Sequence, residues 1–191
     1  MTTSALTTEI PGYIAGRWAI DQVHSEVGFS VRHLMVSKVR GRFAQFEGEI
    51  VTGEDPLASS VSAEVDMSSV DTNNADRDAH LRSADFFAAD QHPTLTYRST
   101  GVRRGDDGFV VDGELTLHGV TKSVPLTLEL NGFQPETPFG DTRAGFSAHA
   151  EIDRRDFGIT FNMALEGGGV GLGDKVHITL EVDAILQPPA A

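Results

Sequence analysis

Apolar and polar side chains alternate one by one along most of this sequence, and no other feature constrains its fold as much. In the first such run, residues 25–35, the apolar side chains of Val27, Phe29 and Val31 are each separated by a small or polar residue. Similar runs recur at residues 61–67, 111–117, 124–130, 144–152 and 176–184. Two weaker runs lie at residues 40–50 and 94–100. Alternation is typical of strands with one buried and one solvated face. The sequence therefore predicts about eight short antiparallel strands, closed as a barrel or packed as a sandwich.

Turn-forming residues separate several of these runs where hairpins need them. The turns fall at residues 53–56, 104–108 and 118–119. Phe43 and Phe46 are three positions apart, so both can face the same side of one strand only if a bulge intervenes. Pro125 opens a strand and is expected where its missing N–H costs nothing. These signals favour a series of antiparallel hairpins.

One segment, residues 71–91, lacks the alternation and is predicted to be helical. Asp71 or Thr72 is the expected N-cap, because both side chains can accept a hydrogen bond from the first helical turn. Pro93 ends any helix before the next strand. A single helix in a barrel-like protein commonly packs across one end of the barrel. We expect one domain over residues 1–191, with its core at about 18–186 and flexible termini.

Composition excludes several classes of function. With 15 basic and 28 acidic residues the net charge is −13, so the chain as a whole repels nucleic acid and anionic headgroups. No cysteine is present, which excludes disulfides, thiol nucleophiles and cysteine-ligated metals. No apolar stretch is long enough for a spanning helix, so stable membrane insertion is not expected. Residues 1–15 contain no lysine or arginine, and a cytoplasmic location is therefore predicted.

Motifs for enzymatic chemistry are weak. The glycine-rich segment 167–173 resembles a phosphate-binding loop but lacks the following Lys-Ser/Thr, so we expect a plain loop there. No histidine pair has the i, i+4 spacing of a helical metal site, and no metal is predicted. His33 follows Phe29 and Val31 on the apolar face of its run. It is either a core histidine with a hydrogen-bond partner or a polar group that orients a ligand at the end of a pocket.

Basic residues gather in one place on this acidic chain. Residues 27–46 carry Arg32, Lys38, Arg40 and Arg42 but no acid. Such a patch is a candidate contact for an anion, and Arg40 and Arg42 are the candidates for a ligand headgroup. The alternative is a solvated outer face, because these arginines alternate with less polar residues.

The ordered series of short motifs resembles the YceI-like family of lipid-binding, lipocalin-like proteins. The motifs are Trp18-Ala19-Ile20-Asp21-x-x-His24-Ser25, Val27-x-Phe29-x-Val31-x-His33-Leu34-Met35, Gly41-x-Phe43-x-x-Phe46-x-Gly48, Arg77-Asp78-x-His80-Leu81-x-Ser83-x-Asp85-Phe86-Phe87, Gly113-x-Leu115-Thr116-Leu117-His118-Gly119 and Arg155-Asp156-Phe157-Gly158-Ile159. The resemblance extends over residues 18–185. It implies an all-β, eight-stranded antiparallel lipocalin-like barrel with a helical segment near residues 71–91 by the barrel mouth. It also implies a long apolar ligand in the lumen and a homodimer, and many relatives are periplasmic.

An eight-stranded barrel either fills with side chains or encloses one slender ligand. Small residues on the predicted inner faces, namely Ala63, Gly113, Ala144, Ala148 and Ala150, favour an open lumen. The predicted ligand-binding residues are Phe29, Val31, His33, Phe43, Phe46, Leu81, Phe86, Phe87, Tyr97, Leu115, Leu117, Phe146, Ile178 and Leu180. Among them, Phe86 and Phe87 are expected to guard the entrance, and His33 or Tyr97 to touch the polar end of the ligand.

The sequence thus predicts non-catalytic binding, storage or transport of a long-chain lipid, such as a polyisoprenoid, an isoprenoid quinone precursor or a fatty acid or amide. No cofactor is expected. Three alternatives remain open at this point: an enzyme acting on such a lipid with His33 as general base, a haem or metal barrel that uses His33 and another inward histidine, and a purely structural dimerisation module.

Overall fold

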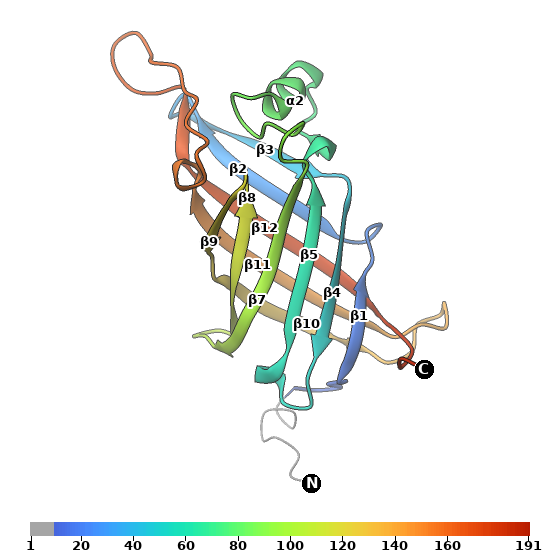
Figure 1. The fold of residues 1–191 in the computed structure, drawn as a ribbon. Coiled ribbons are helices and arrows are strands. Elements are labelled where there is room, and N and C mark those ends of the chain that lie inside the picture. Colours follow the sequence, from blue (N-terminus) through green and yellow to red (C-terminus); the bar gives the residue numbers. More distant parts are fainter. Residues whose placement is uncertain (1–9) are drawn as a thin grey trace.

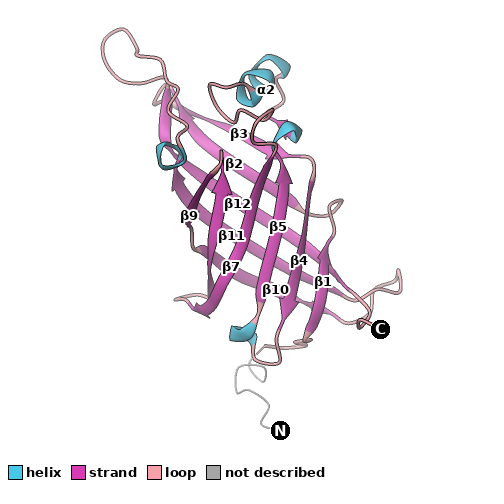
Figure 2. Ribbon diagram, in the orientation of Figure 1, coloured by secondary structure: helices cyan, strands magenta, loops and turns pink. Residues whose placement is uncertain are grey.

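The computed structural model describes residues 10–191, in which twelve antiparallel strands form the wall of a closed barrel (Figures 1 and 2). The strands are β1 Gly16–Ile20, β2 Glu26–His33, β3 Ser37–Phe43, β4 Phe46–Thr52, β5 Ser60–Asp66, β6 Val70–Asp71, β7 Thr94–Arg104, β8 Phe109–Leu117, β9 Val120–Ser123, β10 Leu126–Gln134, β11 Arg143–Asp153 and β12 Leu172–Leu186. The helices are α2 Ala75–Arg82 and the short 3₁₀ turns η1 Pro56–Ala58, η2 Met67–Ser69 and η3 Arg154–Phe157.

The twelve strands behave as eight long ones, because four of the long strands are interrupted. β1 and β2 both pair with β12 and together form one interrupted strand. β4 pairs with β1 and β3 with β2, so β3 and β4 form a second one. β5 pairs with β4 and β6 with β3, so β5 and β6 form a third. β9 and β10 both pair with β8 in the same way. β12 pairs with β11 along one edge and with both β1 and β2 along the other, which closes the wall. The prediction of an eight-stranded antiparallel barrel is confirmed.

The interruptions correct two predicted strands. Residues 40–50 are not one strand with a bulge, because the strand is interrupted at Ala44 and Gln45. The backbone groups of these two residues form hydrogen bonds with Ser69 and Asp66. Phe43 thus ends β3 and Phe46 begins β4, and both line the lumen. The run at residues 25–35 ends as a strand at His33.

Two further differences concern β1 and Pro125. β1, with the buried Trp18, was not among the predicted strands. Pro125 lies between β9 and β10, outside any strand, so its missing N–H interrupts no ladder, as expected.

The helical segment is shorter than predicted. α2 spans only Ala75–Arg82, and its N-cap is Asn74, whose side chain accepts a hydrogen bond from the Arg77 N–H at 2.9 Å. Asp71 belongs to β6, and Thr72 donates to the buried Asp78 of α2 through both its N–H and its hydroxyl. The predicted N-caps are therefore wrong, because β6 continues through Asp71. α2 lies across one end of the barrel (Figure 1), which we term the upper end; η1 marks the lower end.

The interior contains two clusters of buried apolar side chains. The larger one occupies the upper and middle barrel and includes Phe43, Leu115 and Phe157. The smaller one surrounds Trp18, which is fully buried and donates its indole N–H to the Thr52 hydroxyl at 2.8 Å. Among the residues that the structure describes, no helix has the length and apolar character needed to cross a bilayer.

Candidate functional site

The barrel encloses two apolar cavities that lie end to end in the lumen. The lower cavity has a volume of about 220 Å³ and the upper one about 280 Å³. Both are lined by the side chains of Phe29, Phe43, Leu95 and Ile178. These four side chains, which we term the waist, mark the boundary between the cavities. Together the cavities reach the range of roughly 300–1,000 Å³ that is typical of small-molecule sites.

Each of the fourteen predicted ligand-binding residues lines at least one cavity. Phe29, Phe43 and Ile178 line both. The lower cavity is also lined by Phe46, Tyr97, Leu115, Phe146 and Leu180. The upper cavity is also lined by Val31, His33, Leu81, Phe86, Phe87 and Leu117. Alternation along the strands identified the members that lie in strands, whereas Leu81, Phe86 and Phe87 come from the helical segment. Contact of all these side chains with a ligand stays a prediction.

The small residues on the inner faces have unequal roles. Ala63 and Ala148 line the lower cavity, so they leave open space. Ala144 packs in the cluster around Trp18, and the side chain of Tyr97 covers Gly113, where a Cβ would lie 2.5 Å from the tyrosine Cζ. Ala144 and Gly113 therefore accommodate large aromatic side chains of the protein itself and leave no room there for a ligand.

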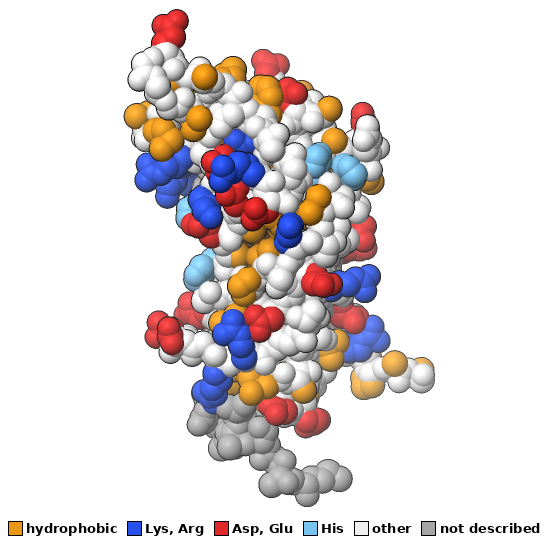
Figure 3. Space-filling view, turned by 60° about the vertical axis from the view of Figure 1, so that its left-hand side comes forward, with side chains coloured by type: hydrophobic (Ala, Val, Ile, Leu, Met, Phe, Trp, Pro, Cys, Tyr) orange, Lys and Arg blue, Asp and Glu red, His pale blue; other side chains and the backbone are white. Residues whose placement is uncertain are grey.

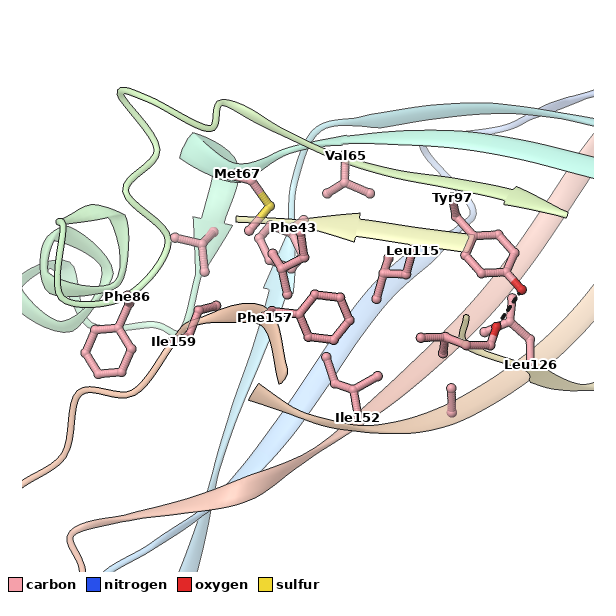
Figure 4. Close-up of a cluster of buried hydrophobic side chains, with 14 of the residues drawn as sticks. Phe43, Val65, Met67, Phe86, Tyr97, Leu115, Leu126, Ile152, Phe157 and Ile159 are labelled. Atoms are coloured by element: carbon pink, nitrogen blue, oxygen red, sulfur yellow. Dashed lines mark hydrogen bonds between the residues drawn. The ribbon is translucent and has the colours of Figure 1, made fainter. Parts of the chain in front are cut away.

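Tyr97 is a wall residue whose hydroxyl is fully engaged. It donates to the carbonyl oxygens of Val124 at 2.8 Å and Val111 at 3.2 Å (Figure 4). Burial and, to a smaller extent, the charge of Asp112 raise the pKa of Tyr97 to about 12. The ring contributes to the lower cavity, but the hydroxyl is used by the wall. This corrects the expectation that Tyr97 touches the polar end of a ligand.

Three aromatic rings close the upper cavity beneath α2. The His80 ring contacts those of Phe86 and Phe161 edge to face, each at a centroid distance of 5.0 Å, and the two phenylalanine rings are 5.3 Å apart. The Nε2 atom of His80 lies 2.8 Å from a carboxylate oxygen of Asp85. Phe87 points deeper and contacts the ring of Phe43 at 6.0 Å. Phe86 is thus part of the closing layer, and Phe87 belongs to the cavity wall.

The upper cavity has polar lining residues that the sequence analysis did not assign to the site. These are Arg77, His80, Arg154 and Asn162. Arg154 is buried and donates to the carbonyl oxygens of Gly173, Ile159 and Phe161, and burial lowers its pKa. Arg77 and His80 belong to a segment that resembles the family motif, which was the available signal. Arg154 lies in η3, outside any alternating run, and gave none.

Arg40 and Arg42 do not reach the lumen. Both lie exposed on the outer face of β3, because the alternating Val39 and Phe43 point inward, and neither lines a cavity. Arg42 pairs instead with Asp71 on β6 at 3.2 Å. Neither arginine therefore belongs to the wall of the lumen, and contact of Arg40 or Arg42 with a ligand headgroup at the rim stays a prediction.

His33 also differs from one of its two expected roles. It is exposed at the end of β2 and lines the upper cavity, so it is not a core histidine. Across residues 10–191, no group of three or more histidine, aspartate or glutamate side chains is arranged to hold a metal ion. Every buried polar side-chain atom in the described part of the chain has a hydrogen-bond partner. The lumen therefore offers a ligand mainly apolar contact.

Comparison with known proteins places this barrel in a family. A YceI-like domain matches residues 18–184. The chain belongs to the YceI-like family. The chain is 40% identical to Protein YceI of Escherichia coli O157:H7 over 190 residues, covering 98% of this chain and 96% of that protein. A UPF0312 protein of Pseudomonas aeruginosa is 38% identical over 165 residues, or 86% of this chain and 83% of that protein.

Solved structures of other proteins have the same fold. The Campylobacter jejuni YCEI protein superimposes with a TM-score of 0.67 and 30% identity, over 88% of this chain and 96% of that one. A polyisoprenoid binding domain from Saccharophagus degradans gives a TM-score of 0.68 at 17% identity, over 91% of this chain and 100% of that one.

Proposed function

We propose that this protein binds a long-chain apolar molecule, such as a polyisoprenoid or a fatty acyl compound, in its lumen without transforming it. The observation that carries the proposal is the pair of apolar cavities meeting at the waist of Phe29, Phe43, Leu95 and Ile178. A slender chain can extend from one cavity into the other, whereas a compact ligand would fill only one. Membership of the YceI-like family and the polyisoprenoid-binding character named for one structural relative support the same ligand class.

Apolar burial alone suffices for such binding. Each buried methylene group contributes roughly 0.8 kcal/mol, so a chain of about 15 carbons gains on the order of 10 kcal/mol before ordering costs. Polar groups are then needed only to orient one end of the ligand. We place that end in the upper cavity, where Arg77, His80 and Arg154 lie. At the lower end, Trp18 and Phe133 pack together at a ring distance of 5.6 Å.

Native mass spectrometry of gently purified protein tests the proposal. We expect adduct masses that match long-chain lipids, and displacement of a fluorescent fatty acid by a polyprenyl compound. Extraction after prolonged incubation should return the lipid chemically unchanged. A homogeneous unliganded mass together with no uptake of the fluorescent probe would contradict binding, and a modified lipid would contradict the non-catalytic role. The same spectra measure whether the protein forms the expected homodimer.

A further inference from the structure

Exposed apolar side chains protrude beside the upper cavity from two segments, which we term the apolar tip. Met35 and Val36 lie in the turn between β2 and β3 with exposed fractions of 52% and 84%, and Met163 on the loop before β12 is 63% exposed. The segments are joined, because the Leu34 N–H donates to the carbonyl of Gly171 at 2.9 Å. Leu34 and Met163 also line the upper cavity. The tip is therefore part of the rim of the lumen.

The backbone of the tip is held in an unusual conformation. Leu34 and Met35 both have left-handed backbones, with φ values of 51° and 60°. Two consecutive residues of this kind make a tight hairpin turn in which asparagine and glycine are strongly favoured, and bulky residues are strained there. A polar sequence at this turn would form the same hairpin with less strain and without exposed apolar surface. The sequence of this turn thus exposes apolar side chains at the expense of local stability.

Three cationic side chains lie directly below the tip on the outer wall, namely Arg32, Lys38 and Arg40. Arg32 stands opposite Lys38 in the β2–β3 register, an arrangement of like charges that destabilises a strand pair. None of the three forms an ion pair with any acid among residues 10–191. Hydrophobic and basic side chains gather side by side at the upper end of the molecule in Figure 3.

Local charge decides what this end of the molecule can approach. The net charge of −13 repels anionic surfaces at long range, but salt screens charges beyond about 8 Å at physiological ionic strength. Acids also lie at the upper end, where Asp76 on α2 and Asp85 just after it are exposed. Glu166 is exposed on the loop, and Asp174 is already paired with Arg154 and Arg155. Each lysine or arginine close to an anionic bilayer strengthens binding, and apolar side chains entering the interface add to this.

We propose that the apolar tip and its three cations dock the upper end of the barrel onto a bilayer that contains anionic lipids. This places the rim of the upper cavity against the membrane, so that a ligand can pass between bilayer and lumen. The transfer of a ligand rests on the proposed function, whereas docking itself depends only on the exposed surface.

Vesicle co-sedimentation of the full chain tests docking. Binding is compared between vesicles of phosphatidylcholine alone and vesicles in which a third of the lipid is phosphatidylglycerol. We expect binding only to the anionic vesicles, and its loss when salt is raised from about 0.15 M to about 1 M, where screening shortens to about 3 Å. Equal binding to both vesicle types, or none to either, would overturn the proposal.

Two variants separate the apolar and the electrostatic contributions. M35N/V36S replaces the protruding side chains, and its asparagine suits the left-handed backbone, so folding is preserved. K38E/R40E reverses two of the cations. Each variant should bind anionic vesicles at least about tenfold more weakly than the unaltered protein. Unchanged binding by either variant would contradict its contribution to docking.

Matched controls use equivalent substitutions elsewhere on the surface. F139S removes an apolar side chain that is 85% exposed in the turn between β10 and β11, and R98E/K122E reverses two exposed cations on β7 and β9. Both controls should bind as the unaltered protein does. If they weaken binding as much as the tip variants, the effect comes from overall charge or apolarity and not from the tip.

Ligand uptake distinguishes docking from the lumen function. The tip variants should still take up a fluorescent fatty acid supplied in solution. If the unaltered protein takes up the fatty acid but does not bind vesicles, docking is overturned and the lumen function stands. If it binds vesicles but takes up no fatty acid, docking stands and the lumen function is overturned. If M35N/V36S instead converts a dimer into a monomer, in the absence of vesicle binding, the tip is a contact between two copies of the chain.

Discussion

The ring of Phe29 lies directly over Gly41, its cross-strand partner on β3. A Cβ atom at position 41 would come within 2.7 Å of the Phe29 Cε1 atom and 2.9 Å of the Thr72 Cγ2 atom. The missing side chain thus lets the phenylalanine ring lie close to the wall. From there it contacts Phe43 at a ring distance of 5.6 Å and contributes to the waist between the two cavities.

The first prediction concerns this glycine. Gly41→Ala should push the Phe29 ring toward the lumen, lower the free energy of unfolding by about 1–3 kcal/mol and weaken the uptake of a long-chain ligand. Chemical denaturation and a fluorescent lipid probe measure the two effects. Gly101→Ala on β7 is the control, because a Cβ there would meet nothing within 4 Å. Equal effects of the two substitutions would contradict the close packing of Phe29 on Gly41.

A second prediction follows from the Tyr97 hydroxyl, which donates to two carbonyl groups of the wall. Tyr97→Phe should destabilise the protein by about 1–2 kcal/mol, because the buried carbonyls of Val111 and Val124 lose this donor. The cavity keeps its shape, so ligand affinity should change little. Denaturation midpoints and probe titrations measure both quantities. A large loss of affinity with unchanged stability would show that the hydroxyl contacts ligand and not the wall.

A third prediction concerns how the stability that Tyr97 contributes depends on pH in the alkaline range. The pKa of Tyr97 is raised to about 12 in the folded protein, against about 10 for an unfolded tyrosine. The stabilisation associated with this shift is fully present below pH 10 and is lost as pH rises through about 12, because the unfolded state releases the proton first. The stability advantage of the unaltered protein over Tyr97→Phe should therefore shrink between these pH values. An advantage that stays constant would contradict the raised pKa.

Alternation predicted the wall of the lumen because it fixes which side chains of a strand face inward. The predicted side chains that lie in strands line a cavity for this reason, whereas Leu81, Phe86 and Phe87 were predicted from the helical segment. Alternation could not locate β1, whose five residues are too few for a repeated pattern. It also could not show that Ala144 and Gly113 serve to accommodate Trp18 and Tyr97, because this depends on neighbours far away in the sequence.

The rim of the upper cavity was harder to predict than its wall. Arg77, Arg154 and Asn162 come from a helix, a 3₁₀ turn and a loop, and only the closed barrel brings them together. The interruption of the strand between Phe43 and Phe46 could not be predicted from the sequence either. Sequence spacing suggested a bulge between them, whereas the chain breaks there, with hydrogen bonds to the segment 66–69.

A fourth prediction concerns Asp21, whose carboxylate links the segment between β1 and β2 to Arg143 on β11. A carboxylate oxygen of Asp21 lies 2.7 Å from the His24 Nδ1 atom and 2.8 Å from Arg143, and these hydrogen bonds lower its pKa to about 2. The stability that results is present above the unfolded pKa of about 4 and is lost as pH falls through about 2. Asp21→Asn should thus lower the melting temperature at pH 7, with the difference disappearing in acid.

Thermal unfolding over a pH series measures this dependence. Asp107→Asn is the matched control, because Asp107 is exposed in the turn between β7 and β8 and forms no ion pair among residues 10–191. The control should melt as the unaltered protein does at every pH. A deficit of Asp21→Asn that persists at pH 2 would show that the asparagine disturbs packing and that the charge of Asp21 is not the cause.

The last prediction tests whether a ligand occupies the full length of the lumen. Ala148 lines the lower cavity on β11, so Ala148→Phe should fill part of that space at a cost of about 1–3 kcal/mol in stability. Ligands long enough to cross the waist of Phe29 and Phe43 should then lose affinity, while short ones that fit the upper cavity should be retained. Titration with a series of fatty acids of increasing length measures this cutoff. Thr127→Phe on the exposed face of β10 is the control, and it should leave the length dependence unchanged. If Ala148→Phe binds every chain length as the unaltered protein does, ligands do not enter the lower cavity.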